Sequence, residues 1–353
     1  MMSDILKKDM ETFANSAFPF ESFCGKKFLI TGATGLIGSL IVKTLLFLNE
    51  KKSLNISIWA NVRNINKAIK LYEPYLKDTA LHFCVANLGK DKLVCDDKID
   101  FIIHAASVTA SKVMVTDPVG TVKTSVIGTK DVLTFAVQNK VKSVVYISSM
   151  EVYGEVAGKE RVSEENLGYI DLTNPRSCYP EGKRMCEMLC TAFHTQYGLN
   201  VTSARLAQTF GAGILPTENR VFAQFAKSVV NGDDIVLHTT GKSEGNYVYT
   251  MDAVGAILLL LLKGIPGQAY NISNPKSHTT IKEMAKLVAV RFSKGKSQVV
   301  IDIPKESNLG YAPETKLWLD ISKIKKLGWY PTVGLEESYK RMIIWLIEQK
   351  TNM

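Results

Sequence analysis

Three glycines spaced three residues apart, Gly32, Gly35 and Gly38, impose the strongest constraint on how this chain folds. The apolar run Phe28–Ile30 precedes them and predicts a buried strand, and the apolar run Leu40–Leu48 behind them predicts a helix. Gly32 allows a tight turn, Gly35 lets a ligand approach the backbone, and Gly38 lets helix and strand pack closely. An ordinary turn is the alternative, but the helix N-terminus also offers free N–H groups to phosphates. The stretch therefore predicts a dinucleotide site formed by Gly32, Thr34, Gly35, Leu36, Ile37 and Gly38.

Further apolar runs alternate with helical patterns along the first half of the chain. Strands are predicted at Ile56–Trp59, Leu81–Val85, Asp100–Ala106 and Ser143–Ser148, and a helix at Val122–Asn139. This alternation predicts an α/β fold with a doubly wound parallel (Rossmann) sheet. Ligands of such sheets lie beyond the carboxyl ends of the strands. The candidate residues at these ends are Asn61, Arg63, Asn87, Leu88, Ala105, Ala106, Ser107 and Ser148–Glu151.

The end of the second predicted strand bears on the choice of cofactor. Sites for NAD carry an acidic residue there for the ribose hydroxyls, whereas basic residues accommodate the 2′-phosphate of NADP. This chain has Asn61, Arg63 and then Lys67, and no acid. Arg63 is equally consistent with a loop residue that faces solvent, but its guanidinium also suits a bidentate phosphate contact. The segment therefore favours NADP(H), with NAD(H) as the alternative.

Tyr179 and Lys183 lie four residues apart, before the helical run Arg184–Tyr197, and so share one helical face. The pair suits redox chemistry between a carbonyl and a carbinol, in which a phenol gives or takes a proton although its free pKa is about 10. The Lys183 ammonium and a positive nicotinamide both lower that pKa. Ser148 and Ser149 offer a hydroxyl for the reacting oxygen. A solvated surface pair is the alternative, but the glycine turn upstream favours a catalytic site.

Together these motifs resemble the extended short-chain dehydrogenase/reductase family, and within it the nucleotide-sugar epimerases, dehydratases and decarboxylases. The resemblance implies that Tyr179 is the acid/base, that Lys183 contacts the nicotinamide ribose, and that Ser149 positions the substrate oxygen. It also implies a homodimer that pairs through helices such as 122–139 and 182–197. It runs from about Lys26 to about Leu346 and is carried by Thr31–Gly38, His104–Ala106, Ser148–Gly154, Tyr179, Lys183, Asp320–Lys323 and Leu327–Trp329.

Some positions depart from the pattern of that family. Met150 replaces the Asp of the 4,6-dehydratases, while Glu151 remains, either to move a proton near the sugar or to brace the following loop. Gln208 stands where the family has an Asn for the diphosphate, and Gly245 where it has an Arg. These departures suggest another nucleotide, a polyol or a differently placed diphosphate. The candidate substrate-binding residues are Gln208, with Arg220 or Lys242 to compensate, although both cations are equally consistent with surface charge.

Three regions are expected. Residues 1–24 form an amphipathic N-terminal extension, residues 25–205 the Rossmann domain, and residues 206–353 a smaller, interleaved substrate lobe from which 247–265 returns to the Rossmann domain. The expected activity is NAD(P)-dependent hydride transfer at a sugar or polyol carbon, and Arg63 favours net reduction of a nucleotide-linked keto compound by NADPH. The alternatives are an epimerase, decarboxylase or dehydratase with tightly held NAD, and a dinucleotide-binding sensor without turnover.

Composition argues against other functions. The net charge of +9 comes from scattered lysines, so we expect a basic surface for anionic small molecules and no nucleic-acid site. The longest apolar run, Ala253–Leu262, is too short to span a bilayer, and Met1–Glu11 lacks the apolar centre of a secretory signal. The six cysteines include no CxxC pair and no nearby His ligand, so we expect reduced thiols, a cytoplasmic protein and no metal site.

Overall fold

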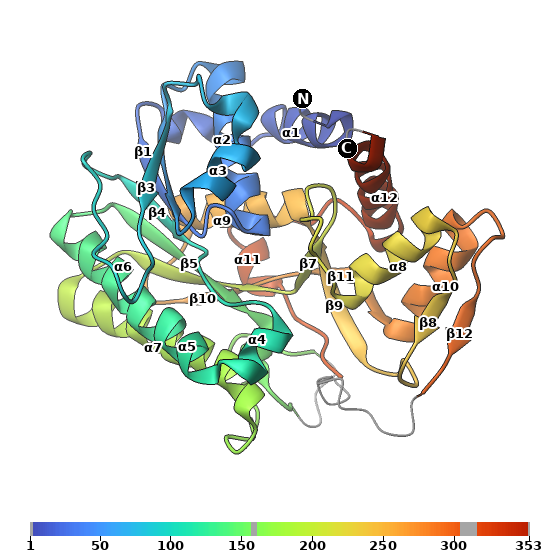
Figure 1. Cartoon of the computed structure of the whole chain (residues 1–353). Helices are drawn as coiled ribbons and strands as arrows, with labels where there is room; N and C mark the ends of the chain where they lie inside the picture. The colour runs from blue at the N-terminus through green and yellow to red at the C-terminus, as the bar shows by residue number, and fades with distance from the viewer. Residues whose placement is uncertain (1–2, 157–160, 304–315, 352–353) are drawn as a thin grey trace.

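The computed structural model describes residues 3–156, 161–303 and 316–351. Its largest element is a seven-stranded sheet in which every paired strand is parallel (Figure 1). The strand order reverses between β1 and β4, which is where the ligand crevice of a doubly wound sheet opens. The predicted fold class is confirmed. In sheet order the strands are β10 (Ala269–Ile272), β6 (Val201–Leu206), β5 (Ser143–Ser149), β4 (Phe101–His104), β1 (Lys27–Thr31), β2 (Ser57–Val62) and β3 (Leu81–Val85).

The sheet is buried on both faces, because alternate side chains of its strands enter two separate apolar layers. On β5, Val145 and Ile147 enter the layer under α2 (Leu36–Lys52) and α9 (Thr250–Lys263). Val144 and Tyr146 enter the other layer. That layer is covered by α6 (Gly128–Gln138) and α7 (Cys178–Tyr197).

Several short helices and turns lie between the strands and the longer helices. The helix expected over 122–139 is divided into α5 (Pro118–Val122), a π-helical turn η3 (Lys123–Ile127) and α6. The turn lies against the loop after β3, where the Lys123 carbonyl oxygen is 3.1 Å from the position of a Cβ on Gly89. The other short elements are α3 (Ile65–Leu71), α4 (Ser111–Thr116), η1 (Phe20–Phe23), η2 (Glu73–Tyr75), η4 (Met150–Tyr153), η5 (Pro175–Ser177) and α11 (Ser322–Lys325).

The remaining strands form two small sheets in a second lobe, drawn to the right in Figure 1. One sheet has the order β11 (Asn274–Thr280), β9 (Glu244–Tyr249), β7 (Gln208–Phe210), and the other pairs β12 (Val299–Ile301) with β8 (Ile235–Leu237). These strands pack with α8 (Val221–Asn231), α10 (Ile281–Phe292) and α12 (Leu335–Thr351).

The chain returns from the second lobe to the main sheet after β9. Helix α9, which lies within the segment 247–265, packs on α2, β5 and β6. The return extends beyond that segment, because β10 pairs with β6 and becomes the seventh strand before β11 rejoins the lobe. Strand β10 is only four residues long and includes the polar Asn271. Its apolar pattern is therefore too weak for the strand to be predicted from sequence.

The N-terminal extension forms a helix, α1 (Asp4–Ala14), that packs on α2, α9 and α12. Its buried Asp9 accepts a hydrogen bond from Arg341 Nη1 of α12 at 2.7 Å and another from the Tyr249 hydroxyl of β9. Burial raises the pKa of the Asp9 carboxyl, although Tyr249 and Arg341 both oppose that shift. The extension therefore joins the helices of the main sheet to the second lobe.

The glycine turn has the geometry that its spacing predicts. Gly32 has a φ of +64°, and a Cβ at this position would lie 2.7 Å from the backbone nitrogen of Ala106. A Cβ on Gly38, in the first turn of α2, would lie 2.3 Å from the Gly32 carbonyl oxygen. Both contacts are with backbone atoms, which cannot rotate away as a side chain can. The first turn of α2 therefore packs on β1 more closely than any larger residue allows.

Gly38→Ala should destabilise the protein although alanine is the better helix former. We expect the free energy of unfolding to fall by about 1–3 kcal/mol, because the new methyl group forces the backbone apart. Gly182→Ala in α7 is the matched control, since its Cβ would meet nothing closer than the Ser125 Cβ at 3.5 Å. Chemical denaturation of both variants measures the difference, and equal losses would contradict the packing argument.

Candidate active site

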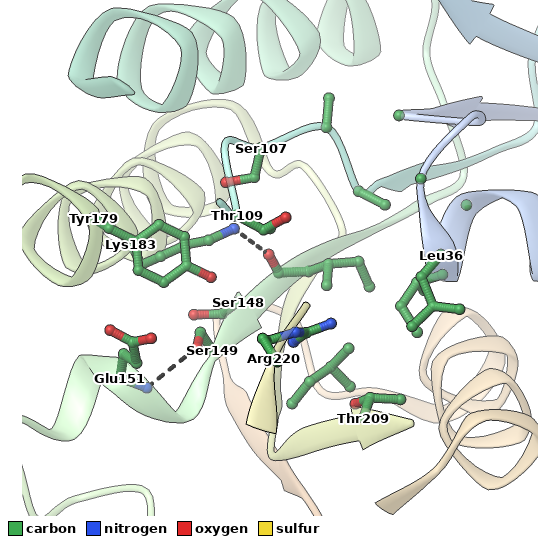
Figure 2. Close-up of a pocket in the computed structure, with 18 of the residues that line it drawn as sticks. Leu36, Ser107, Thr109, Ser148, Ser149, Glu151, Tyr179, Lys183, Thr209 and Arg220 are labelled. Carbon is green, nitrogen blue, oxygen red and sulfur yellow. Dashed lines mark hydrogen bonds between the residues drawn. The ribbon is translucent and has the colours of Figure 1, made fainter. Parts of the chain in front are cut away.

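A cavity of about 540 Å³ opens at the carboxyl ends of the parallel strands. Its walls come from the glycine turn, the ends of β2, β4 and β5, the start of α7, and β7, β9 and the N-terminus of α8 in the second lobe. Figure 2 shows Tyr179, Lys183 and Ser149 together on one wall, with Arg220 of the second lobe close by. The cavity therefore lies between the two parts of the fold.

Three of the four predicted catalytic side chains, those of Ser149, Tyr179 and Lys183, meet in this cavity, and the fourth, Glu151, also lines it. The Ser149 hydroxyl, at the end of β5, lies close enough to the Tyr179 phenol to lower the pKa of that phenol, and it accepts the backbone N–H of Glu151 at 3.2 Å. Lys183 is only 3% exposed, and its Nζ donates to the Ile147 carbonyl oxygen at 2.7 Å. The same Nζ lies 5.8 Å from the centroid of the Tyr179 ring. A phenol, a hydroxyl and an ammonium group thus converge on one point.

Burial dominates the acid–base properties of this group. Burial and the Glu151 carboxylate raise the pKa of Tyr179 to about 12, against the opposing effects of Ser149, Arg220 and Arg176. Burial also lowers the pKa of Lys183 to about 8. Tyr179 is therefore a neutral phenol at pH 7 that can donate a proton. It accepts one near neutral pH only when further positive charge enters the cavity and lowers its pKa.

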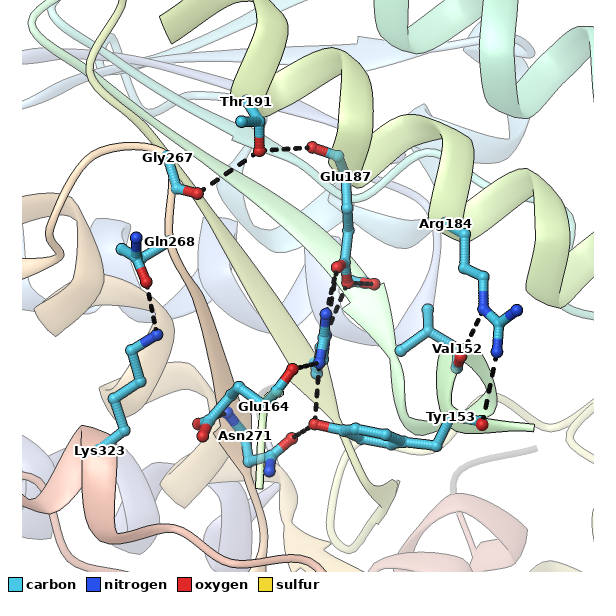
Figure 3. A network of polar contacts seen from close by, with 12 residues as sticks. Val152, Tyr153, Glu164, Arg184, Glu187, Thr191, Gly267, Gln268, Asn271 and Lys323 are labelled. Atoms are coloured by element: carbon cyan, nitrogen blue, oxygen red, sulfur yellow. Dashed lines mark hydrogen bonds and ion pairs between the residues drawn. The ribbon is translucent and has the colours of Figure 1, made fainter. Parts of the chain in front are cut away.

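A buried polar network holds α7 against the sheet (Figure 3). Arg205 of β6 donates to the Glu187 carboxylate of α7, from Nη2 at 2.7 Å and from Nε at 3.0 Å. Glu187 also accepts the hydroxyl of Ser148 on β5. On the far side, Arg205 Nη1 donates to the Tyr153 hydroxyl at 3.0 Å, which in turn donates to Asn271 Oδ1 of β10 at 2.6 Å. The network fixes where α7 sits relative to the end of β5.

The glycine turn and the start of α2 fit the pyrophosphate of a dinucleotide. No side chain caps the N-terminus of α2, so its first N–H groups remain available to an anion. Gly35, the N-cap residue of α2, has no side chain that could cover these N–H groups. All the predicted cofactor residues line the cavity: Gly32, Thr34, Gly35, Leu36, Ile37, Gly38, Asn61, Arg63, Asn87, Leu88, Ala105, Ala106, Ser107, Tyr179 and Lys183.

The end of β2 is basic. Arg63 and Lys67 are exposed and line the cavity there, and the described residues around them that line it include no Asp or Glu. The amide nitrogen of Asn61 is already hydrogen-bonded within the protein, because Nδ2 donates to the carbonyl oxygens of Cys84 and Ala86 at 3.2 Å each. It ties β2 to β3, a structural role that the sequence did not reveal.

His104 braces the sheet and takes no part in acid–base chemistry. Its Nδ1 lies 2.7 Å from the Thr31 hydroxyl of β1, and its Nε2 lies 3.0 Å from the Thr129 hydroxyl of α6. Burial, assisted by the Lys183 charge, lowers the pKa of His104 to about 3. The ring is therefore neutral at physiological pH.

The candidate substrate-binding residues separate in the structure. Gln208 and Arg220 line the cavity, whereas Lys242 is exposed and is not among the described lining residues. Arg220 is held by Glu218, to which Nε donates at 3.0 Å and Nη2 at 2.6 Å. At Gly245 a Cβ would lie 2.6 Å from the hydroxyl oxygen of Tyr247. The Tyr247 side chain thus occupies the space where the resemblance places an arginine.

Sequence reasoning missed Arg176, which lines the cavity from the turn η5. The one available signal was its position three residues before Tyr179, in the turn that precedes α7. Within the described residues, no group of three His, Cys, Asp or Glu side chains could hold a metal ion. Nor does the described part of the chain contain a helix with the length and apolarity needed to cross a membrane.

Comparison with known proteins agrees with this geometry. The model of the NAD dependent epimerase/dehydratase family matches residues 28–273. UDP-glucuronic acid decarboxylase 1 of Danio rerio is 30% identical over 325 residues, which cover 90% of this chain and 72% of that protein. UDP-glucuronic acid decarboxylase 6 of Arabidopsis thaliana is 29% identical over 334 residues, covering 93% and 90%.

Two solved structures share the fold. A UDP-glucose 4-epimerase of Thermotoga maritima superimposes with a TM-score of 0.76 at 23% identity, covering 92% of this chain and 99% of that one. An epimerase of Methanothermobacter thermautotrophicus gives 0.78 at 21% identity, covering 99% and 97%. The resemblance carried by the sequence motifs is confirmed, and the chain belongs to the NAD-dependent epimerase/dehydratase family, enzymes of the extended short-chain dehydrogenase/reductase type.

Proposed function

We propose that this chain transfers a hydride between a nicotinamide and a ring carbon of a UDP-linked sugar. The observation that carries the proposal is the convergence of Tyr179, Ser149 and Lys183 beside the glycine turn in one cavity. The names of the relatives, UDP-glucuronic acid decarboxylases, support the nucleotide sugar as substrate and UDP as its nucleotide. The bound nicotinamide would supply the hydride acceptor or donor.

Each of the three side chains has a distinct part in the proposed reaction. The Ser149 hydroxyl holds the reacting oxygen of the sugar next to Tyr179. Tyr179 takes the proton of that hydroxyl as the carbinol is oxidised and returns it when the carbonyl is reduced. Lys183, fixed by its hydrogen bond to the Ile147 carbonyl, keeps a positive charge beneath the phenol.

We infer that the hydride returns to the sugar within one turnover, as in an epimerase or a decarboxylase. The relatives support this outcome. Oxidation of a ring carbon β to a carboxylate gives a β-keto acid, which loses carbon dioxide without further help from a metal. A second candidate is net reduction of a nucleotide-linked keto sugar by NADPH, which Arg63 and Lys67 at the end of β2 favour.

Tyr179→Phe should lower turnover of a UDP-linked sugar by at least about 100-fold, because the acid/base group is lost. Binding of the dinucleotide should stay within about twofold, since the ring remains in place. Tyr169→Phe is the control, because Tyr169 is exposed and is not among the described residues that line the cavity. Mass spectrometry of the products measures turnover, and a fully active Tyr179→Phe would reject the role of Tyr179.

The basic end of β2 predicts tighter binding of NADP⁺ than of NAD⁺, by about 10-fold, through a charge-assisted contact with Arg63. Arg63→Ala should remove this preference by weakening NADP⁺ alone. Calorimetric titration of both dinucleotides tests it. Co-purification of tightly held NAD with negligible affinity for NADPH would overturn the preference and the second candidate function with it.

We propose a homodimer formed through α5, η3 and α7. These neighbouring elements expose the apolar side chains of Val119, Val122, Ile127, Met185 and Met188, an apolar patch larger than isolated surface residues produce. Met188→Lys should therefore shift the sedimentation coefficient toward that of the monomer. Val290→Lys, at an exposed apolar side chain on α10, is the control and should leave it unchanged. A monomeric wild-type protein would refute the dimer.

A further inference from the structure

An ion pair stands inside the cavity, next to Tyr179. Arg176 Nη1 lies 2.9 Å from Glu151 Oε2, and Nη2 lies 3.2 Å from Glu151 Oε1. The two parallel contacts form the bidentate arrangement in which a guanidinium best binds a carboxylate. Both side chains line the cavity and remain partly exposed, Arg176 at 18% and Glu151 at 26%. The pair is therefore accessible to a bound ligand.

The two partners come from the turns that flank the catalytic groups. Glu151 lies in η4, two residues after Ser149, and Arg176 lies in η5, three residues before Tyr179. Asn174 fixes η5 by accepting the backbone N–H of Arg176 at 3.0 Å. Within the described residues, Arg176 Nε is buried and has no hydrogen-bond partner. The guanidinium thus retains a donor that its pair with Glu151 does not use.

The pair also determines what Glu151 can do. While Arg176 binds both of its oxygens, the Glu151 carboxylate is a poor hydrogen-bond partner for a sugar hydroxyl. A ligand carboxylate has the same geometry as the Glu151 side chain and can replace it on the guanidinium. A neutral hydroxyl cannot compete, because hydrogen bonds between charged groups are about twice as strong as neutral ones.

We propose that Arg176 is a specificity-determining residue that exchanges Glu151 for a carboxylate on the sugar. A sugar acid thereby seats its carboxylate on Arg176 and frees Glu151 beside Tyr179, whereas a neutral sugar leaves the pair closed. The inference rests on the proposed function, because it assigns the substrate class of the same cavity. That class is nucleotide-linked sugars that carry a carboxylate.

The exchange makes opposite predictions for its two members. Arg176→Gln removes the receptor, so UDP-glucuronic acid should bind at least about 10-fold more weakly. Glu151→Gln removes the competing carboxylate, so UDP-glucuronic acid should bind several-fold more tightly. UDP-glucose, the neutral counterpart, should change by less than about threefold in both variants. Calorimetry with the dinucleotide-loaded protein measures all six affinities, without relying on turnover.

Glu181→Gln is the matched control. Glu181 also pairs with an arginine, Arg184, at 2.9 Å in α7, but it is not among the described residues that line the cavity. It should change neither affinity. Thermal unfolding of each variant excludes a general loss of structure as the cause of weaker binding.

The outcomes separate the two proposals. Opposite effects of Arg176→Gln and Glu151→Gln on UDP-glucuronic acid alone support the exchange. Equal weakening by both, or equal effects on the acidic and the neutral sugar, overturns it, because a purely structural pair behaves that way. Wild-type protein that binds neither UDP-sugar overturns the proposed function, and the inference with it.

Discussion

The buried ion pair between Arg205 and Glu187 is the contact on which the arrangement of the proposed catalytic side chains depends. Its side chains are only 6% and 13% exposed. Burial lowers the pKa of Arg205, but the hydrogen bonds and charge of Glu187 outweigh burial and raise it. Such a pair adds little net stability over apolar residues, yet removing one partner costs about 3–5 kcal/mol. Helix α7 therefore has one position on β5 and β6 that satisfies both charges, and that position sets where Tyr179 and Lys183 lie.

The same polar network extends from β6 to β10 and to the segments around Val162 and Asp320. The Tyr153 hydroxyl accepts a hydrogen bond from Arg205 and donates one to Asn271 of β10. Asn271 Nδ2 in turn donates to the carbonyl oxygens of Val162 and Asp320, at 3.2 and 2.9 Å. The insertion of β10 into the main sheet thus has a structural reason: it brings Asn271 to this network. At the N-terminus, Asp9 of α1 accepts a hydrogen bond from Arg341 of α12, so this contact links the extension to a helix of the second lobe.

The fold, and the placement of Ser149, Tyr179 and Lys183 in one cavity, were predictable from sequence because their signals are local. The glycine spacing and the step from Tyr179 to Lys183 each specify geometry within one turn or one helix. The positions of Arg176 and Tyr247 in the cavity were not predictable, because both depend on contacts that only the fold creates. Arg176 pairs with Glu151, which lies 25 residues away in the chain. The Tyr247 side chain fills the space beside Gly245. Asn61 lies at the end of β2, where the sequence placed it. Its amide nitrogen, however, donates to carbonyl oxygens of β3 and the residue after it, a contact that no local sequence pattern indicates.

The distribution of charge within the cavity, more than the net charge of +9, determines which ligands it suits. At the β2 end, Arg63 and Lys67 form no ion pair with any described residue, so they attract an anion from solution. At the opposite end, beside Tyr179, Arg176 pairs with Glu151 and Arg220 pairs with Glu218. An anionic group of a ligand can bind either arginine only by displacing the carboxylate already paired with it. The free-energy cost of that displacement falls only when the ligand offers an equivalent bidentate group. Under the proposed exchange at Arg176, selectivity at this end is a competition between carboxylates, whereas the cations Arg63 and Lys67 at the other end supply the attraction for an anion.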